Sequence, residues 1–131
     1  MIEEIKYNDI LLAIIIRNDF HCDGVKFFTP DESSQQLAFM SHPKGKKIQP
    51  HLHNKCERTI HSTKEVLFIK SGKIHVDFYS NNQEYLESRD LYAGDVILLS
   101  EGGHGFEFLE DAQMFEVKQG PYLGDMDKVR F

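Results

Sequence analysis

The sequence predicts an all-β protein, built as a sandwich or a closed barrel with little helix. Short apolar or alternating stretches recur along the chain at roughly 8 to 12-residue intervals, which is typical of antiparallel β architectures. Clusters of Gly, Pro and Asn separate these stretches. The 131 residues suit one domain with a single core, and no repeat or composition shift indicates a second.

The expected strands follow from apolar runs and period-2 alternation. In chain order they are 10–16, 25–28, 36–40, 66–69, 74–79, 96–99, 106–109 and 114–118. In the stretch KIHVDFY, the apolar residues Ile74, Val76 and Phe78 define the core face, so His75 and Asp77 should point outward. One helical turn is expected over 30–34, because Thr29 could cap it and Pro30 would occupy its first position.

Composition and charge exclude several classes of function. The net charge of -6 argues against nucleic acid or an anionic membrane as a partner, because both require clustered Lys and Arg. The longest apolar run, Ile10 to Ile16, is far too short to span a bilayer, and the N-terminal residues do not resemble a signal peptide. A cytoplasmic location is therefore expected, with Cys22 and Cys56 as free thiols.

A metal site is indicated by the stretch PHLHNKCERTIHSTKEVLFIKSG, residues 50–72. His51 and His53 are two apart, so on a strand both imidazoles would project from one face. Imidazole suits Zn, Fe, Ni or Cu, and an added carboxylate extends the choice to Mn. Cys56 has the opposite parity, and we expect it to be a buried small apolar residue rather than a ligand.

The spacing of these residues resembles the first motif of the cupin superfamily, Gly-x5-His-x-His-x(3 or 4)-Glu-x6-Gly, which would run from Gly45 to Gly72. The stretch GDVILLSEGGH, 94–104, resembles the second motif. The resemblance implies one cupin domain over 1–131, with core motifs at 45–108, N-terminal strands at 10–40 and a C-terminal extension at 119–131. It further implies a double-stranded β-helix, a jelly-roll-like barrel, that forms homodimers. One divalent ion, Fe, Mn, Ni or Zn, would be bound by His51, His53, Glu65 and His104.

Two departures from the family pattern leave alternatives open. Eleven residues, Asn54 to Lys64, separate His53 from Glu65, whereas Glu57 has the family's spacing from His53. We favour Glu65 as the ligand, because the VLFI strand and the Gly72 turn place it in the barrel. The inserted residues should then form a loop at the barrel mouth.

In the second motif, His104 comes one residue early, after Gly102 and Gly103, which could tighten the turn without strain. His104 should share an inward strand face with Phe106 and Phe108.

The resemblance favours an enzyme whose metal acts as a Lewis acid on a small polar substrate, such as a sugar or nucleotide sugar, in an isomerisation or epimerisation. Glu57, His61 or a metal-bound hydroxide would serve as the base. Arg58, Phe106 and Tyr122 are candidates for substrate binding, and Lys118, Lys128 and Arg130 could bind an anionic group if the tail folds over the mouth. An iron-dependent dioxygenase and a non-catalytic sugar-binding cupin are the alternatives.

Overall fold

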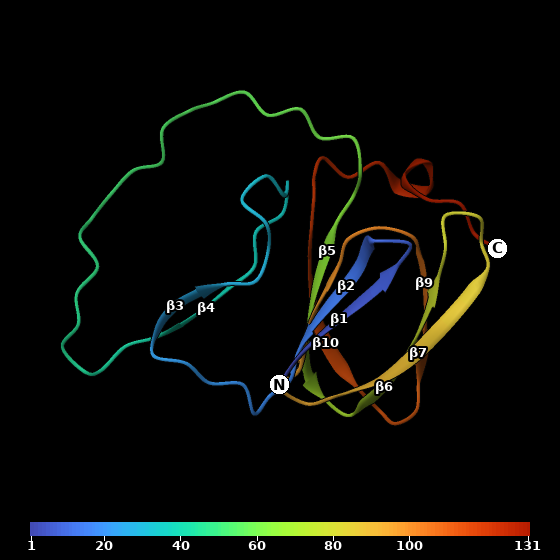
Figure 1. The fold of residues 1–131 in the computed structure, drawn as a ribbon, viewed down its shortest axis with the longest axis horizontal. Helices are drawn as coiled ribbons and strands as arrows, with labels where there is room; N and C mark the ends of the chain where they lie inside the picture. The colour runs from blue at the N-terminus through green and yellow to red at the C-terminus, as the bar shows by residue number, and fades with distance from the viewer.

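The structure, a computed structural model, describes residues 1–131 and consists of two antiparallel sheets packed face to face, with a hairpin projecting from them (Figure 1). The larger sheet has the order β1-β2-β8-β5-β10, and the smaller has the order β7-β6-β9. The projecting hairpin is formed by β3 and β4.

The strands have the following bounds: β1 Ile2–Tyr7, β2 Ile10–Ile16, β3 Gly24–Phe27, β4 Ala38–Ser41, β5 Glu65–Ser71, β6 Lys73–Tyr79, β7 Tyr85–Tyr92, β8 Val96–Leu99, β9 Gly103–Phe108 and β10 Gln113–Lys118. A single 3-10 turn, Gly124–Asp127, lies in the C-terminal tail. This turn is too short to cross a membrane, and the chain contains no longer helix.

The core lies between the two sheets, where the period-2 patterns of the strands meet. Leu67 and Ile69 of β5 face Ile74, Val76 and Phe78 of β6, and all five side chains are buried. Burying a side chain of this size contributes about 1.5–3 kcal/mol of transfer free energy. The predicted core face of β6 is therefore confirmed, and His75 and Asp77 lie on the outer face.

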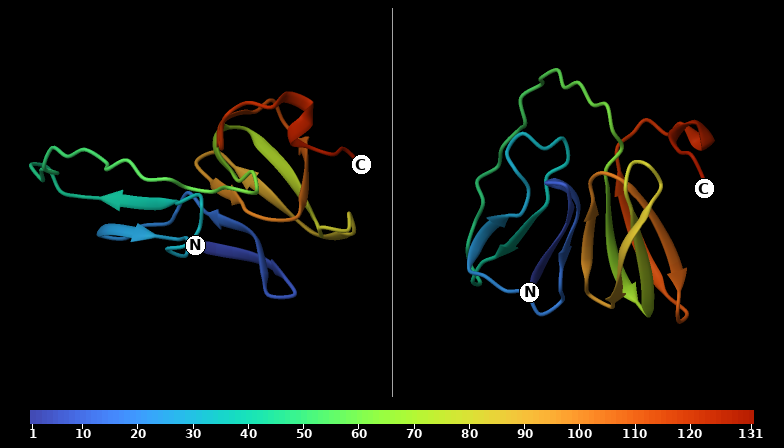
Figure 2. Two further views of the ribbon diagram at one scale, coloured as in Figure 1. Left: turned by 90° about the horizontal axis from the view of Figure 1, so that it is seen from above. Right: turned by 45° about the vertical axis from the view of Figure 1, so that its right-hand side comes forward.

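A second apolar cluster lies on the outer face of the larger sheet. Ile14, Ile16 and Leu98 are buried there. The segment between β2 and β4 covers them with Phe20, Phe28 and Leu37. This contact anchors the β3-β4 hairpin, whose far end extends away from the sheets (Figure 2).

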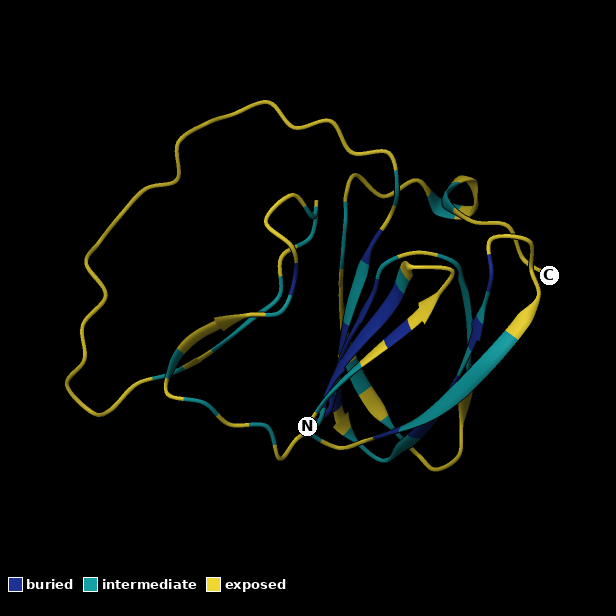
Figure 3. Cartoon of the chain, viewed as in Figure 1, coloured by how far each residue is buried: buried dark blue, intermediate teal, exposed yellow.

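Residues 42–63, called the arm below, connect the end of β4 to the start of β5. They form a wide arc outside the sheets, and every one of them except Ser62 is exposed (Figure 3). Their only backbone-backbone hydrogen bond joins Lys46 to Pro43. The predicted strand that would hold His51 and His53 is therefore absent from this structure, and the prediction that Cys56 is buried is wrong.

One buried carboxylate joins the two sheets at the start of β8. Asp95 accepts hydrogen bonds from the backbone N–H groups of Asn18 and Tyr92 and from the Arg17 guanidinium, each at 2.9 Å. Arg17 also donates to the carbonyl of Asp90 at 2.7 Å and to Glu3. Because strands from both sheets end here, the network fixes how one sheet sits against the other.

The structure confirms the all-β class and the eight predicted strands, with ends shifted by a few residues. It adds β1 and β7, whose many polar side chains hid the strand pattern. In β1, for example, the charge of Glu3 is matched by Arg17 and Arg89.

The expected helical turn at 30–34 is wrong. The side chain of Gln36 donates to the carbonyls of Pro30 and Ser33 and holds this segment as a tight loop. The sheets form no closed barrel, so the double-stranded β-helix remains a proposal.

We predict that Asp95→Ala lowers the free energy of unfolding by about 3 kcal/mol, because it leaves Arg17 and two backbone donors without their acceptor. Denaturant unfolding of the purified variant would measure this. Asp19→Ala is the matched control: it removes an exposed ion pair with the N-terminus and should cost less than about 1 kcal/mol. Equal losses in the two variants would contradict the role assigned to Asp95.

Candidate functional site

The strand register brings Glu65 and His104 together at the end of the sandwich opposite Asp95. Glu65 begins β5 and lies on the same face as the buried Leu67. His104 pairs with the buried Phe78 across β6 and β9, and so points inward, as predicted, whereas Phe108 on the same strand is 52% exposed. The His104 Nε2 and Glu65 Oε2 atoms are 3.2 Å apart, and both side chains are largely shielded from solvent.

These two side chains line a cavity of about 990 Å³, called the mouth cavity below. Its wall is formed by the end of the arm, the turn before β9 and the C-terminal tail, which folds over this end of the sandwich (Figure 1). The Phe131 ring packs edge-on against Tyr79, with centroids 5.0 Å apart. A Cβ atom at Gly103 would lie 2.9 Å from the Phe131 ring, so the glycine leaves room for the tail.

Two residues of the edge strand β10 approach Glu65, and one of them, Glu116, was not predicted from the sequence. Glu116 and Lys118 share a strand face with Met114, and Lys118 pairs with Glu65 in the β5-β10 register. The His104 hydrogen bond holds the pKa of Glu65 below its usual value. Partial burial and the nearby Glu65 carboxylate raise the pKa of Glu116. The alternation of β10 could have revealed Glu116, but only the pairing shows which residues it approaches.

The four predicted metal ligands form two separate pairs. Glu65 and His104 meet in the mouth cavity, whereas His51 and His53 lie together on the arm, with ring centroids 5.3 Å apart. No cluster of three or more potential ligands forms. Glu65 and His104 suit a divalent transition metal as two of its donors. In this conformation His51 and His53 lie outside the mouth cavity, so the full set of four ligands remains a prediction.

The other predicted site residues also divide between the mouth and the arm. His61 lines the mouth cavity, as do Lys128 and Arg130 of the tail. Phe106 lies beside His104, with ring centroids 5.4 Å apart. Tyr122 is exposed, with Lys118 Nζ 5.8 Å from its ring centroid. Glu57 lies on the exposed arm and is not among the residues that line the mouth cavity.

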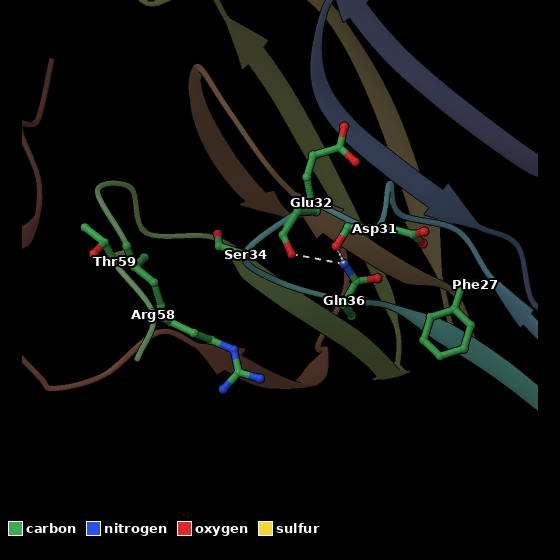
Figure 4. A pocket seen from close by; sticks show the side chains of 9 residues that line it. Phe27, Asp31, Glu32, Ser34, Gln36, Arg58 and Thr59 are labelled. Atoms are coloured by element: carbon green, nitrogen blue, oxygen red, sulfur yellow. Dashed lines mark hydrogen bonds between the residues drawn. The ribbon is translucent and has the colours of Figure 1, made fainter. Parts of the chain in front are cut away.

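Arg58 lines a different cleft, of about 590 Å³, between the arm and the loop after β3. Figure 4 shows Arg58 and Thr59 on one side of this cleft and Asp31, Glu32 and Gln36 on the other. Arg58 and the mouth cavity therefore do not share a site in this structure.

A second polar cluster occupies the outer face of the smaller sheet. His75 Nδ1 lies 2.6 Å from Asp90, and its Nε2 lies 3.2 Å from Asp77. Lys73 also contacts Asp90, at 3.1 Å. The group lies outside the mouth cavity and the Arg58 cleft, and with both ring nitrogens facing carboxylates the imidazole lacks a free nitrogen to act as a base.

Comparison with known proteins found no matching family model, no similar curated protein and no similar solved structure. The assignment of function therefore depends on the residues and geometry described above.

We predict that His75 titrates above the usual histidine range, because its hydrogen bond to Asp90 and the charge of Asp77 raise its pKa. A raised folded-state pKa means that the stabilisation is complete below about pH 6.5, the ordinary histidine value, and is lost as the pH rises through the folded-state pKa. NMR titration of the His75 ring would measure this.

In the same titration, Asp90→Asn should lower the His75 pKa. His75→Gln should flatten this part of the stability-pH curve, whereas His21→Gln, at an exposed site, should leave it intact. An unchanged His75 titration in Asp90→Asn would contradict the assignment.

Proposed function

We propose that the chain is a cupin-type, metal-dependent enzyme that acts on a small polar substrate, of the sugar or nucleotide-sugar class, at the mouth cavity. The observation that carries the proposal is the Glu65-His104 pair, 3.2 Å apart, inside a cavity of about 990 Å³. Such a volume is at the upper end of the range typical of small-molecule sites.

The cavity offers groups of the kind that a nucleotide sugar requires. Ser62 and Thr63 supply hydroxyl groups along its wall, where the Thr63 hydroxyl donates to Asp127, and Tyr79 and Phe131 supply aromatic rings. Lys128 and Arg130 add positive charge from the tail, where Arg130 also pairs with Asp125 at 3.0 Å. Arginine and lysine bind phosphate through charge-assisted hydrogen bonds, which favours a substrate with an anionic group.

Glu65 and His104 would provide two of the metal's donors, together with His51 and His53 from the arm. A divalent ion bound there would polarise a carbonyl or hydroxyl group as a Lewis acid. His61, which lines the cavity, is the best-placed base of those predicted, and Glu57 would require the arm to move. Isomerisation or epimerisation is the reaction type that this arrangement favours.

We predict that the purified protein contains a divalent transition metal, and that His104→Ala and Glu65→Gln each weaken its binding by more than about tenfold, since even groups that only orient a ligand contribute that much. Elemental analysis and metal titration would measure this. His21→Ala, at an exposed site away from the mouth cavity, is the matched control and should bind metal as the unmodified chain does. A metal-free protein, or unchanged binding in both site variants, would reject the metal site.

We predict that nucleotide sugars bind more tightly than free sugars. The double variant Lys128→Ala/Arg130→Ala should lose about tenfold or more in affinity for nucleotide sugars alone, because a hydrogen bond to a charged group contributes about 1.5–3 kcal/mol. Isothermal titration calorimetry with both ligand sets would measure this, with Lys26→Ala as the control. Binding without turnover would favour the sugar-binding alternative, and oxygen consumption with substrate would favour the dioxygenase.

A further inference from the structure

The arm has the features of a segment that binds elsewhere. It carries Ile48, Leu52 and Ile60 in exposed positions, and Leu52 is 95% exposed. Beyond Lys46, its backbone forms no hydrogen bond with another backbone group. An extended segment with apolar side chains and free backbone groups is suited to adding a strand to an open sheet edge.

The mouth cavity has such an edge beside it. Strand β9, which carries His104, is paired with β6 on one side and with no strand on the other. A segment bound along β9 would lie next to His104 and the Glu65 that contacts it. Because His51 and His53 are already adjacent on the arm, one docking event would bring both to this pair.

Charge favours the same encounter. The arm carries Lys44, Lys46, Lys47, Lys55 and Arg58 against a single acid, Glu57, for a net charge of +4. The rest of the chain then has a net charge of -10. Opposite net charges favour the approach of the arm of one copy to the body of another.

The arm's attachment to β4 favours a mouth on another molecule, although its attachment to β5 lies beside the mouth cavity of its own chain. The hairpin is held to the outer face of the larger sheet by Phe20, Phe28 and Leu37, and its far end carries Ser41 away from the mouth (Figures 1 and 2). His53 lies 12 residues from Ser41 at one end of the arm and 12 residues from Glu65 at the other, so it can extend up to about 40 Å from either anchor, which is long enough to reach a neighbouring molecule.

The outer face of the larger sheet also has room for a second copy. Two rows of apolar residues cross this sheet and become more exposed toward its edge. In one row, Ile14 and Leu98 are buried, whereas Val117 on β10 is 59% exposed. In the other, Ile16 is buried, whereas Phe68 is 41% and Phe115 61% exposed.

The chain's own hairpin thus covers only part of a continuous apolar face. That hairpin has apolar side chains of its own in solvent, namely Val25, Phe27 and Met40. Each copy therefore offers both an uncovered sheet and an uncovered hairpin, which a two-fold dimer could bury together.

From these observations we infer that the protein is an arm-exchanged homodimer in which the arm of one copy binds at the mouth cavity of the other, so that His51 and His53 of one chain complete the site of Glu65 and His104 in its partner. The inference rests on the metal site proposed above. It explains why the donors form two separate pairs in a single chain.

Mixing two variants tests the exchange through metal content. His51→Ala/His53→Ala removes the arm donors, and Glu65→Gln/His104→Ala removes the mouth donors, so neither variant should bind metal alone. After the two are refolded together in equal amounts, about one quarter of the unmodified protein's metal content should return. Half of randomly formed two-fold dimers are mixed, and each mixed dimer has one complete site of two. Metal content that stays at the level of the separate variants, while the unmodified protein binds metal, would overturn the inference in favour of a site within one chain.

Cross-linking tests the exchange without metal. Chains labelled with nitrogen-14 and nitrogen-15 are refolded together and treated with an amine-reactive cross-linker, which can join Lys55 on the arm to Lys128 at the mouth cavity. Exchange predicts a dimeric native mass and linked Lys55-Lys128 peptides that contain both isotopes. A monomeric mass, or linked peptides of one isotope only, would overturn the inference. A dimer with mixed-isotope links and no metal would instead support the exchange and reject the metal site.

Discussion

The Asp95 carboxylate is the constraint on which the arrangement of the two sheets depends. It occupies the turn between β7 and β8, where the smaller sheet meets the larger, and it binds Arg17 and two backbone N–H groups. A buried carboxylate is tolerated only when it is fully hydrogen-bonded, so the turn has little freedom to move. This end of the sandwich is closed, and strand β8 leaves it in a defined register between β2 and β5.

The opposite end of the sandwich, where the mouth cavity lies, is open because of the way β8 pairs with β2 and β5. Strand β8 ends at Leu99, which pairs with Glu65, and the chain then turns through Gly102 into β9. Gly102 has a φ of +76°, and a Cβ atom there would lie 2.4 Å from the Tyr79 carbonyl oxygen, so the tight turn requires glycine. His104 is thereby directed at Glu65, while the unpaired edge of β9 leaves the mouth cavity accessible to the arm and the tail.

Much of the site followed from local pattern alone. The alternation of β6 correctly placed His75 and Asp77 outside, and the parity of β9 correctly turned His104 inward. The turn glycine at Gly72 placed Glu65 at the start of a strand. Pattern failed for His51 and His53, which were expected to share one face of a strand and lie instead in the arm. A strand forms only where a partner edge is available, and the spacing of two histidines carries no information about that edge.

The sequence by itself determined the all-β class, most strand positions and the side-chain faces, because period-2 alternation is a local property of the backbone. Only the tertiary structure decided which side chains meet. The contact between Glu65 and His104, the approach of Glu116 and the fold of the tail over Gly103 depend on strand pairings between residues far apart in the chain. The separation of His51 and His53 from Glu65 and His104 also depends on distant pairing. The strand edge at which we propose that the two histidines bind is that of β9, some fifty residues further along the chain.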